Sequence, residues 1–192
     1  FIKSLAAMAA DLRNTIEAEV EGFDASPAAV AERRRRVFDP VSGYEYFVNH
    51  YFPHYVRSPH KSQLHEYLFK TLPAMLRRKD NAFEATAAPR AEAKSTMVSR
   101  LFTLWGVVTG QKHYILLVMD SIDQAYPILE SVKAELEVNP RLKTDFPEAC
   151  GQGRVWQAAT AITANGIKIE AAGSGKRLRG RTHGAFRPDL VI

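Results

Sequence analysis

Between residues 81 and 138, strand-like and helix-like patterns alternate, and this alternation constrains the fold more than any other feature of the chain. The run "HYILLVM" at 113–119 has the length and apolar character of a buried strand, and helical periodicity follows it in "SIDQAYPILESVKAELEV". Before it, "NAFEATAA" (81–88) predicts a strand and "KSTMVSRLFTLWGVV" (94–108) predicts a helix. This order favours a parallel sheet with helices packed against it.

The part of the chain before residue 81 has helical patterns. Residues 3–21 have apolar side chains at three- and four-residue spacing, which predicts an amphipathic helix. A serine followed by proline is a helix-start signal, and it occurs at Ser26-Pro27 and again at Ser58-Pro59. Between these two helices, a short aromatic helix is expected to end before Pro53, and Pro73 is expected to bend or end the fourth helix.

After residue 150 the patterns are those of short strands. The dipeptide Asn165-Gly166 lies between "ATAITA" and "IKIEAAG", which is a strong hairpin signal. A loop rich in glycine and arginine then leads to "DLVI" at 189–192, an expected buried strand. Because this strand has no turn or cap after it, the sequence is expected to be a fragment. We expect a helical region over 1–57 and one α/β domain over 58–192.

Composition narrows the class of protein. The chain has 192 residues, and a formal net charge of +5 with an isoelectric point near 9.4 suits a polyanionic partner such as nucleic acid. No apolar run is long enough for a membrane span, and no secretory leader is visible. A single cysteine, Cys150, excludes an internal disulfide framework and is expected to occupy an ordinary, non-catalytic position.

The segment between the first predicted strand and its helix has the outline of a phosphate-binding loop. The pattern GxxxxGK[ST] aligns with "APRAEAKS", so alanine stands at both glycine positions, Ala88 and Ala93. The residues that do the chemistry are present: Lys94 would reach the β- and γ-phosphates, and the Ser95 hydroxyl would bind magnesium. A chance alanine-rich turn between a strand and a helix is the alternative.

Two further side chains of this loop are charged. Arg90 lies four residues ahead of Lys94 and is placed to touch phosphate. Glu92 would repel a triphosphate unless it points to solvent or pairs with an arginine. Alanine in a left-handed conformation costs roughly 1–2 kcal/mol, which a surrounding fold can absorb, so the loop can persist without glycine.

The run from "PRAEAKST" to "AELEVNPRLKTDF", with the later "ITANGIKIEAAGSGKRLRGRTHGAFRPDLVI", resembles the ATPase half of the large terminase subunit of tailed phages and prophages. The resemblance covers roughly residues 58–192. It implies a P-loop NTPase fold of the ASCE type, with a mainly parallel central sheet, flanking helices and a preceding helical segment. The implied activity is Mg²⁺-dependent ATP hydrolysis that drives double-stranded DNA into a capsid. The implied partners are DNA, the portal protein, the small terminase subunit and further copies in a ring, in the host cytoplasm.

The family's site residues carry over one at a time. An arginine at the place of Arg90 and alanine at that of Ala93 agree with the family's deviant Walker A loop, whereas Ala91 and Glu92 depart from it. Gln63 matches the glutamine that reads adenine, with an exposed helix glutamine as the alternative. The implied nucleotide-binding set, with Ser95 also as the magnesium ligand, is Gln63, Pro89, Arg90, Ala91, Glu92, Ala93, Lys94, Ser95 and Thr96.

The family also supplies an arginine to a neighbouring subunit's site. Arg179 is our first choice for this trans-acting arginine and Arg187 the second, with a solvated or DNA-facing arginine as the equal alternative for each. In the family the last strand leads into the Walker B acids, which would lie beyond Ile192. Asp189 is not expected to replace them because it lies at the beginning of the strand, whereas the family's magnesium ligand lies at the far end. We therefore expect this fragment to hydrolyse ATP poorly or not at all.

Several polar groups have two interpretations. Asp120, Asp123 and Gln124 either cap a helix or couple the site to movement, and Arg33 to Arg36 form either a solvated helix end or a DNA contact. The histidines at 50, 54, 60 and 65 are expected to be ordinary packing or surface residues, since no acid or cysteine completes a metal-ligand set. The alternative functions are a non-hydrolysing P-loop module that binds DNA or portal, and another helicase-like P-loop ATPase.

Overall fold

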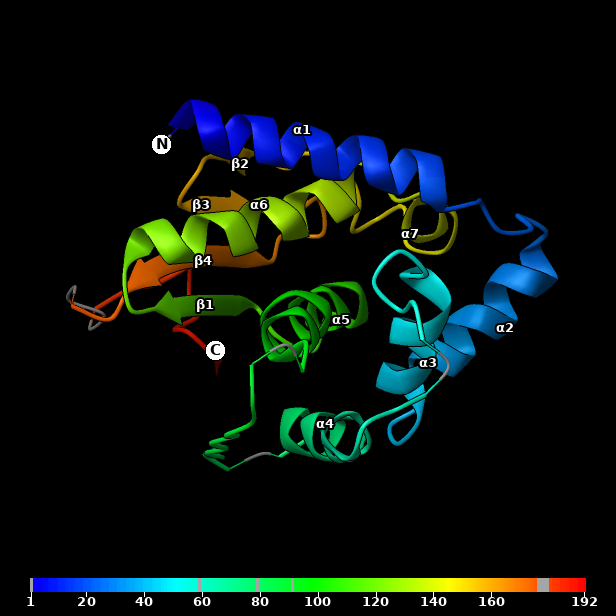
Figure 1. Cartoon of the computed structure of the whole chain (residues 1–192), viewed down its shortest axis with the longest axis horizontal. Coiled ribbons are helices and arrows are strands. Elements are labelled where there is room, and N and C mark those ends of the chain that lie inside the picture. Colours follow the sequence, from blue (N-terminus) through cyan, green and yellow to red (C-terminus); the bar gives the residue numbers. More distant parts are fainter. Residues whose placement is uncertain (1, 59, 79, 91, 176–179) are drawn as a thin grey trace.

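The computed structural model describes residues 2–58, 60–78, 80–90, 92–175 and 180–192. Its architecture is α/β, with a five-stranded mixed sheet in the order β2-β3-β4-β1-β5 and helices around it (Figure 1). The helices are α1 (Ile2–Glu19), α2 (Pro27–Val37), α3 (Gly43–Tyr51), α4 (Gln63–Leu76), the π-helix η1 (Ser95–Leu101), α5 (Phe102–Thr109), α6 (Ile122–Val138) and α7 (Pro140–Asp145). The strands are β1 (Tyr114–Met119), β2 (Val155–Trp156), β3 (Thr160–Ile162), β4 (Lys168–Gly173) and β5 (Leu190–Val191).

The sheet is not mainly parallel, so this part of the predicted fold was wrong. Strand β1 runs parallel to β4 and to β5, but β3 runs antiparallel to both β2 and β4. The cause is the predicted hairpin at Asn165-Gly166, where Gly166 has a φ of 85° and returns the chain directly beside itself. Two strands joined by so short a turn can pair only antiparallel.

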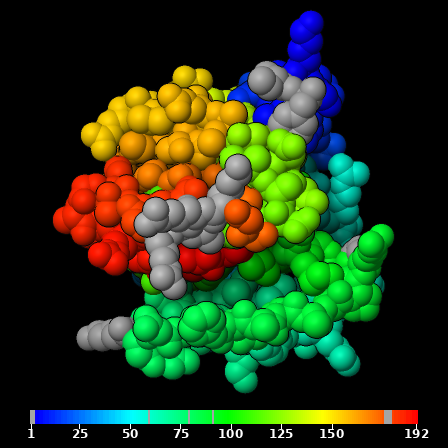
Figure 2. Space-filling model, turned by 90° about the vertical axis from the view of Figure 1, so that its left-hand side faces the viewer, coloured from blue at the N-terminus to red at the C-terminus, as the bar shows by residue number. Residues whose placement is uncertain are grey.

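The predicted strand over 81–88 does not form. The described residues of this segment are extended but pair with no neighbouring strand, and the Phe83 side chain is 98% exposed. Figure 2 shows the extended chain after α4 as a green ridge on the surface, below the C-terminal residues in red. An alternating pattern makes a strand only where a second strand satisfies its N–H and C=O groups, and no strand of the described residues lies beside 81–88.

The helix predicted over 94–108 forms, but with a π-helical first half, η1, that continues into α5. Helix α4 begins four residues later than the Ser58-Pro59 signal indicated, because the Ser62 side chain accepts a hydrogen bond from the His65 amide and acts as the cap. Pro73 lies inside α4 rather than at its end. The other predicted helices and the buried strand at 113–119 are confirmed to within a few residues.

Helix α6 lies between α1 and the sheet (Figure 1). Ile16 of α1 and Val20, the residue after its end, pack with Ala134 of α6. The main core lies under the sheet and extends into an aromatic group, in which the buried Tyr44 ring of α3 packs on Phe69 of α4 and on Phe102 and Trp105 of α5. The division at residue 57/58 stays a prediction.

Among the described residues, no helix has both the length and the apolar character that a bilayer crossing requires.

Candidate functional site

The described residues on either side of Ala91, 88–90 and 92–96, form a curl immediately before a helix. The chain turns at Arg90, bends at Glu92 and enters the helix at Lys94. Ala93 has a φ of 53°, and among the described residues it is the only non-glycine with positive φ. This is the left-handed conformation that favours glycine, and the penalty for alanine is roughly 1–2 kcal/mol. The second glycine position of the loop pattern is therefore filled by an alanine in a glycine-like conformation.

The Lys94 side chain folds back across this curl. Its ammonium nitrogen donates to the carbonyl oxygen of Ala88 at 2.6 Å and to that of Pro89 at 2.5 Å. An ammonium group has three N–H donors, so one remains for another acceptor. Lys94 thus joins the beginning of the loop to its end and is held near the helix start, where backbone N–H groups lack intrahelical partners.

The helix after the loop is held by the core. The buried Tyr44 hydroxyl of α3 donates to the Met97 carbonyl of η1, and burial raises the Tyr44 pKa well above its ordinary value. Trp105 of α5 donates its indole N–H to the Val37 carbonyl at 3.1 Å. The curl therefore lies at the surface end of a helix whose remaining turns are fixed by buried contacts.

Ser95 and Thr96 occupy the first turn of η1. Ser95 is exposed, Thr96 is half-buried, and within the described part of the chain neither hydroxyl has a partner. A free hydroxyl is an oxygen ligand that Mg²⁺ accepts, and the ion takes its other ligands from phosphate and water. Ser95 therefore fits the predicted magnesium position as a single ligand. No group of three or more histidine, cysteine, aspartate or glutamate side chains in the described residues could hold a metal ion.

The two other charged residues of the loop differ in their surroundings. Arg90 is exposed, and its guanidinium has no hydrogen-bond or ion-pair partner in the described residues. Glu92 is half-buried and lines the adjoining pocket. The loop therefore offers two cations, Lys94 and Arg90, beside one carboxylate. Ala91, also predicted to bind nucleotide, lies outside the described residues.

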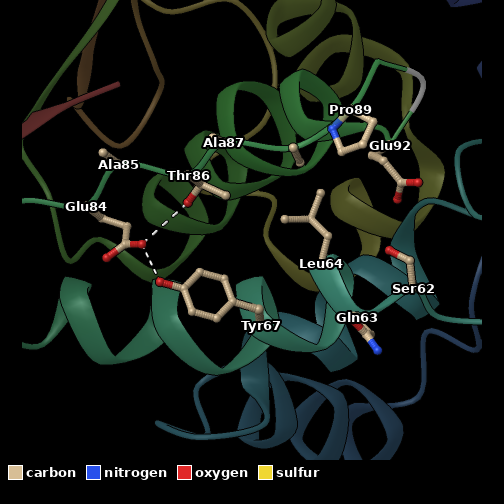
Figure 3. A pocket seen from close by; sticks show the side chains of 11 residues that line it. Ser62, Gln63, Leu64, Tyr67, Glu84, Ala85, Thr86, Ala87, Pro89 and Glu92 are labelled. Carbon is tan, nitrogen blue, oxygen red and sulfur yellow. Dashed lines mark hydrogen bonds between the residues drawn. The ribbon is translucent and has the colours of Figure 1, made fainter.

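A pocket of about 590 Å³ adjoins the loop, between α4 and the extended segment 84–92. Its size falls within the usual range of small-molecule sites, about 300–1,000 Å³. It brings the exposed Gln63, the first residue of α4, together with Pro89 and Glu92 of the loop. These three lie at one end of the pocket in Figure 3, which shows the Gln63 amide directed away from Pro89.

The other end of the pocket contains residues that the sequence analysis missed. The Tyr67 hydroxyl of α4 donates to Glu84 Oε1, and Thr86 Oγ1 lies 3.5 Å from the same oxygen (Figure 3). The bond to the carboxylate raises the Tyr67 pKa. The available signal was the two-residue spacing of Glu84 and Thr86, which places them on one side of an extended segment.

The arginine-rich loop is only partly described. Arg179, the first choice for a trans-acting arginine, lies outside the described residues. Arg187 is exposed and has no partner in the described part of the chain. Arg181, which the prediction did not single out, pairs with Glu170 of β4.

The acidic residues near the strands have different roles. Asp189 accepts hydrogen bonds from the amides of His113 and Tyr114 at 2.9 Å each, so it holds the beginning of β1 beside β5. Asp120 and Asp123 are exposed at the start of α6, whose N-cap is Ser121 with no side-chain capping bond. Capping therefore does not explain these two acids.

The arginine run of α2 makes structural contacts. Arg33 forms two 2.7 Å hydrogen bonds with the buried carboxylate of Asp145, and Arg34 pairs with Glu148 at 2.7 Å. Arg35 pairs with Glu32 on its own helix, and the Arg36 guanidinium lies over the Tyr46 ring. Arg33 and Arg34 are thus bound to protein carboxylates, which neither a solvated helix end nor a DNA contact describes. The exposed Arg35 fits a solvated helix end.

Cys150 is half-buried and His54 is buried, and both have structural surroundings. Burial raises the pKa of the Cys150 thiol to about 12, which keeps the thiol protonated and unreactive near neutral pH. His54 lies 2.7 Å from Glu135, with both side chains 1% exposed. In the described residues, neither Cys150 nor His54 forms a hydrogen bond with a residue of the loop or of the pocket.

No protein-family model matches this chain, and neither a curated protein nor a solved structure matches it.

Proposed function

We propose that this chain is a P-loop nucleotide-binding module, the ATPase part of a viral DNA-packaging terminase large subunit. The observation that carries the proposal is the curl at 88–96, with Ala93 at positive φ, Lys94 folded across the loop and a helix directly after it. The adjoining pocket supports it, because Gln63 and the loop residues Pro89 and Glu92 line one cavity. The family resemblance of residues 58–192 supplies the rest of the assignment.

Different residues of the loop would bind the phosphates of a triphosphate and its magnesium ion. The free N–H of Lys94 and the unpaired guanidinium of Arg90 would bind phosphate oxygens, and amides in the first turn of η1 would donate to them. Ser95 would supply one oxygen to Mg²⁺, which neutralises charge on the phosphates. Glu92 opposes these contacts, so the loop is expected to bind more weakly than one without an acid at this place.

The remaining proposals concern the whole motor. ATP hydrolysis would drive double-stranded DNA through a ring of subunits on the portal protein, with the small terminase subunit as a further partner, in the host cytoplasm. The net charge of +5 suits a DNA-handling protein. Arg187, exposed and unpaired among the described residues, is available to act on a neighbouring copy. Arg179, the first choice for this role, lies outside the described residues and stays a prediction from the sequence.

A second candidate is a P-loop module that binds nucleotide, DNA or portal without hydrolysis. The Lys94 contacts favour it, because two of the three ammonium donors already bind the carbonyls of Ala88 and Pro89. The half-buried Glu92 favours it as well. A helicase-like P-loop ATPase shares the same loop chemistry and would differ in its nucleic-acid task.

The test is a calorimetric titration of Mg·ATP into the wild-type chain and into Lys94→Ala. Loss of a charge-assisted hydrogen bond costs about 1.5–3 kcal/mol, so affinity should fall about tenfold or more. The matched control is Lys70→Ala, which removes an exposed lysine of α4 and should leave affinity unchanged.

Phosphate release measured on the same samples separates the two candidates. The motor proposal predicts slow phosphate release that requires Mg²⁺ and is lost in Lys94→Ala. Binding of Mg·ATP with no phosphate release above the protein-free rate would favour the non-hydrolysing module. Equal affinities of wild type and Lys94→Ala would remove Lys94 from the site and contradict both.

A further inference from the structure

The pocket beside the loop has two chemically different ends. Pro89, Glu92 and Gln63 lie at the end next to the phosphate-binding curl, whereas Tyr67, Glu84 and Thr86 lie at the opposite end (Figure 3). A nucleotide whose phosphates occupy the curl would extend along this pocket. Its base would then meet the second group of residues and not Gln63.

The Glu84 end presents hydrogen-bond acceptors. A carboxylate has no proton to give, so the Tyr67 hydroxyl and the more distant Thr86 hydroxyl direct their protons to Glu84 Oε1. The raised pKa of Tyr67 keeps that proton in place at neutral pH. Glu84 Oε2 has no partner in the described residues and remains free to accept.

The same end also offers a surface for an aromatic ring. Tyr67 is 45% exposed, and Leu64, one helical turn before it, lines the pocket as well. The small side chains of Ala85 and Ala87 leave room on the facing segment. A flat base could therefore stack against an aromatic or aliphatic side chain while its edge reaches the carboxylate.

We propose that Glu84, oriented by Tyr67, is the residue that selects the base, and that it selects one with an exocyclic amino group in the position that adenine offers. The amino group donates to Glu84 Oε2. A base with a carbonyl oxygen at that position places an acceptor against the carboxylate, which is repulsive. Its adjacent ring N–H could donate to Glu84 only if the base shifted away from the position that adenine takes. This inference rests on the proposed nucleotide site and adds a specificity-determining residue to it.

The experiment compares three ligands: ATP, inosine triphosphate, in which a carbonyl replaces the amino group, and pyrophosphate, which has no base. Each is titrated with Mg²⁺ into wild type, Glu84→Gln, Gln63→Ala and the control Glu17→Gln. Glu17 is exposed on α1, so the control removes the same charge away from the pocket. Because Glu84 is exposed on an extended segment, its replacement should leave the fold intact.

Wild type should bind ATP about tenfold more tightly than inosine triphosphate, and Glu84→Gln should bring this ratio close to one without changing pyrophosphate affinity. Glu17→Gln should keep the wild-type ratio. An unchanged ratio in Glu84→Gln, or its loss in Gln63→Ala instead, would overturn the inference. Equal binding of all three ligands to wild type would overturn this inference alone, whereas no binding of any ligand would overturn the proposed function too.

Discussion

At the scale of single residues, Ala93 and Lys94 determine whether the loop can bind phosphate with alanine at both glycine positions of the pattern. Ala93 adopts a φ of 53°, and its strain is tolerated because the following helix is fixed by Tyr44 and Trp105. The sequence pattern predicted that Lys94 binds phosphate. It could not show that the ammonium would bind the Ala88 and Pro89 carbonyls, because that contact depends on the path of the curl.

Replacement of Ala93 by glycine tests the strained conformation. Glycine removes the left-handed penalty of roughly 1–2 kcal/mol and adds an unfolded-state entropy cost of about 0.5–1 kcal/mol. The free energy of unfolding in denaturant should therefore rise by about 0.5 kcal/mol in Ala93→Gly. The matched control is Ala88→Gly, where φ is negative and stability should fall by about the same amount. Destabilisation by both changes would show that Ala93 is not strained.

At the scale of elements, the helices and strands that depend on local sequence patterns were predicted correctly. The helices of the first third, the strand at 113–119 and the Asn165-Gly166 hairpin are confirmed, because each depends on local periodicity or turn chemistry. The strand at 81–88 failed because strand formation depends on a partner elsewhere in the chain. The Tyr67–Glu84 contact was missed for the same reason, since it joins a helix to a segment that had been assigned to the sheet.

The start of α4 provides the test at this scale. Ser62, and not the predicted Ser58, caps the helix that carries Gln63 and Tyr67. Ser62→Ala should lower the free energy of unfolding by about 1 kcal/mol and weaken ATP binding, because it loosens the first turn beside the pocket. Ser58→Ala removes a hydroxyl that, among the residues the structure describes, accepts only from the nearby His60 amide, so its effect on α4 should be smaller. Equal effects of the two changes in denaturation and titration would contradict this assignment of the cap.

At the scale of the whole molecule, buried contacts join the helices, whereas the candidate site lies on an exposed segment. The buried carboxylate of Asp145 binds Arg33 of α2 and the Tyr51 hydroxyl of α3, which joins three helices at one point. The pocket residues Glu84 and Pro89, in contrast, are exposed on a segment that belongs to no sheet. This division places the proposed ligand contacts on a loop whose two ends, α4 and η1, are packed in the core.

The central claim is that the curl at 88–96 binds phosphate through Lys94 and the amides at the start of the helix. The most direct measurement follows backbone amide resonances of isotope-labelled protein during titration with Mg²⁺ and pyrophosphate. The account predicts that the largest, saturable shifts occur at Glu92 to Thr96 and that Lys94→Ala greatly reduces them. Shifts that are absent, or that cluster on another surface such as the arginine run of α2, would contradict the claim.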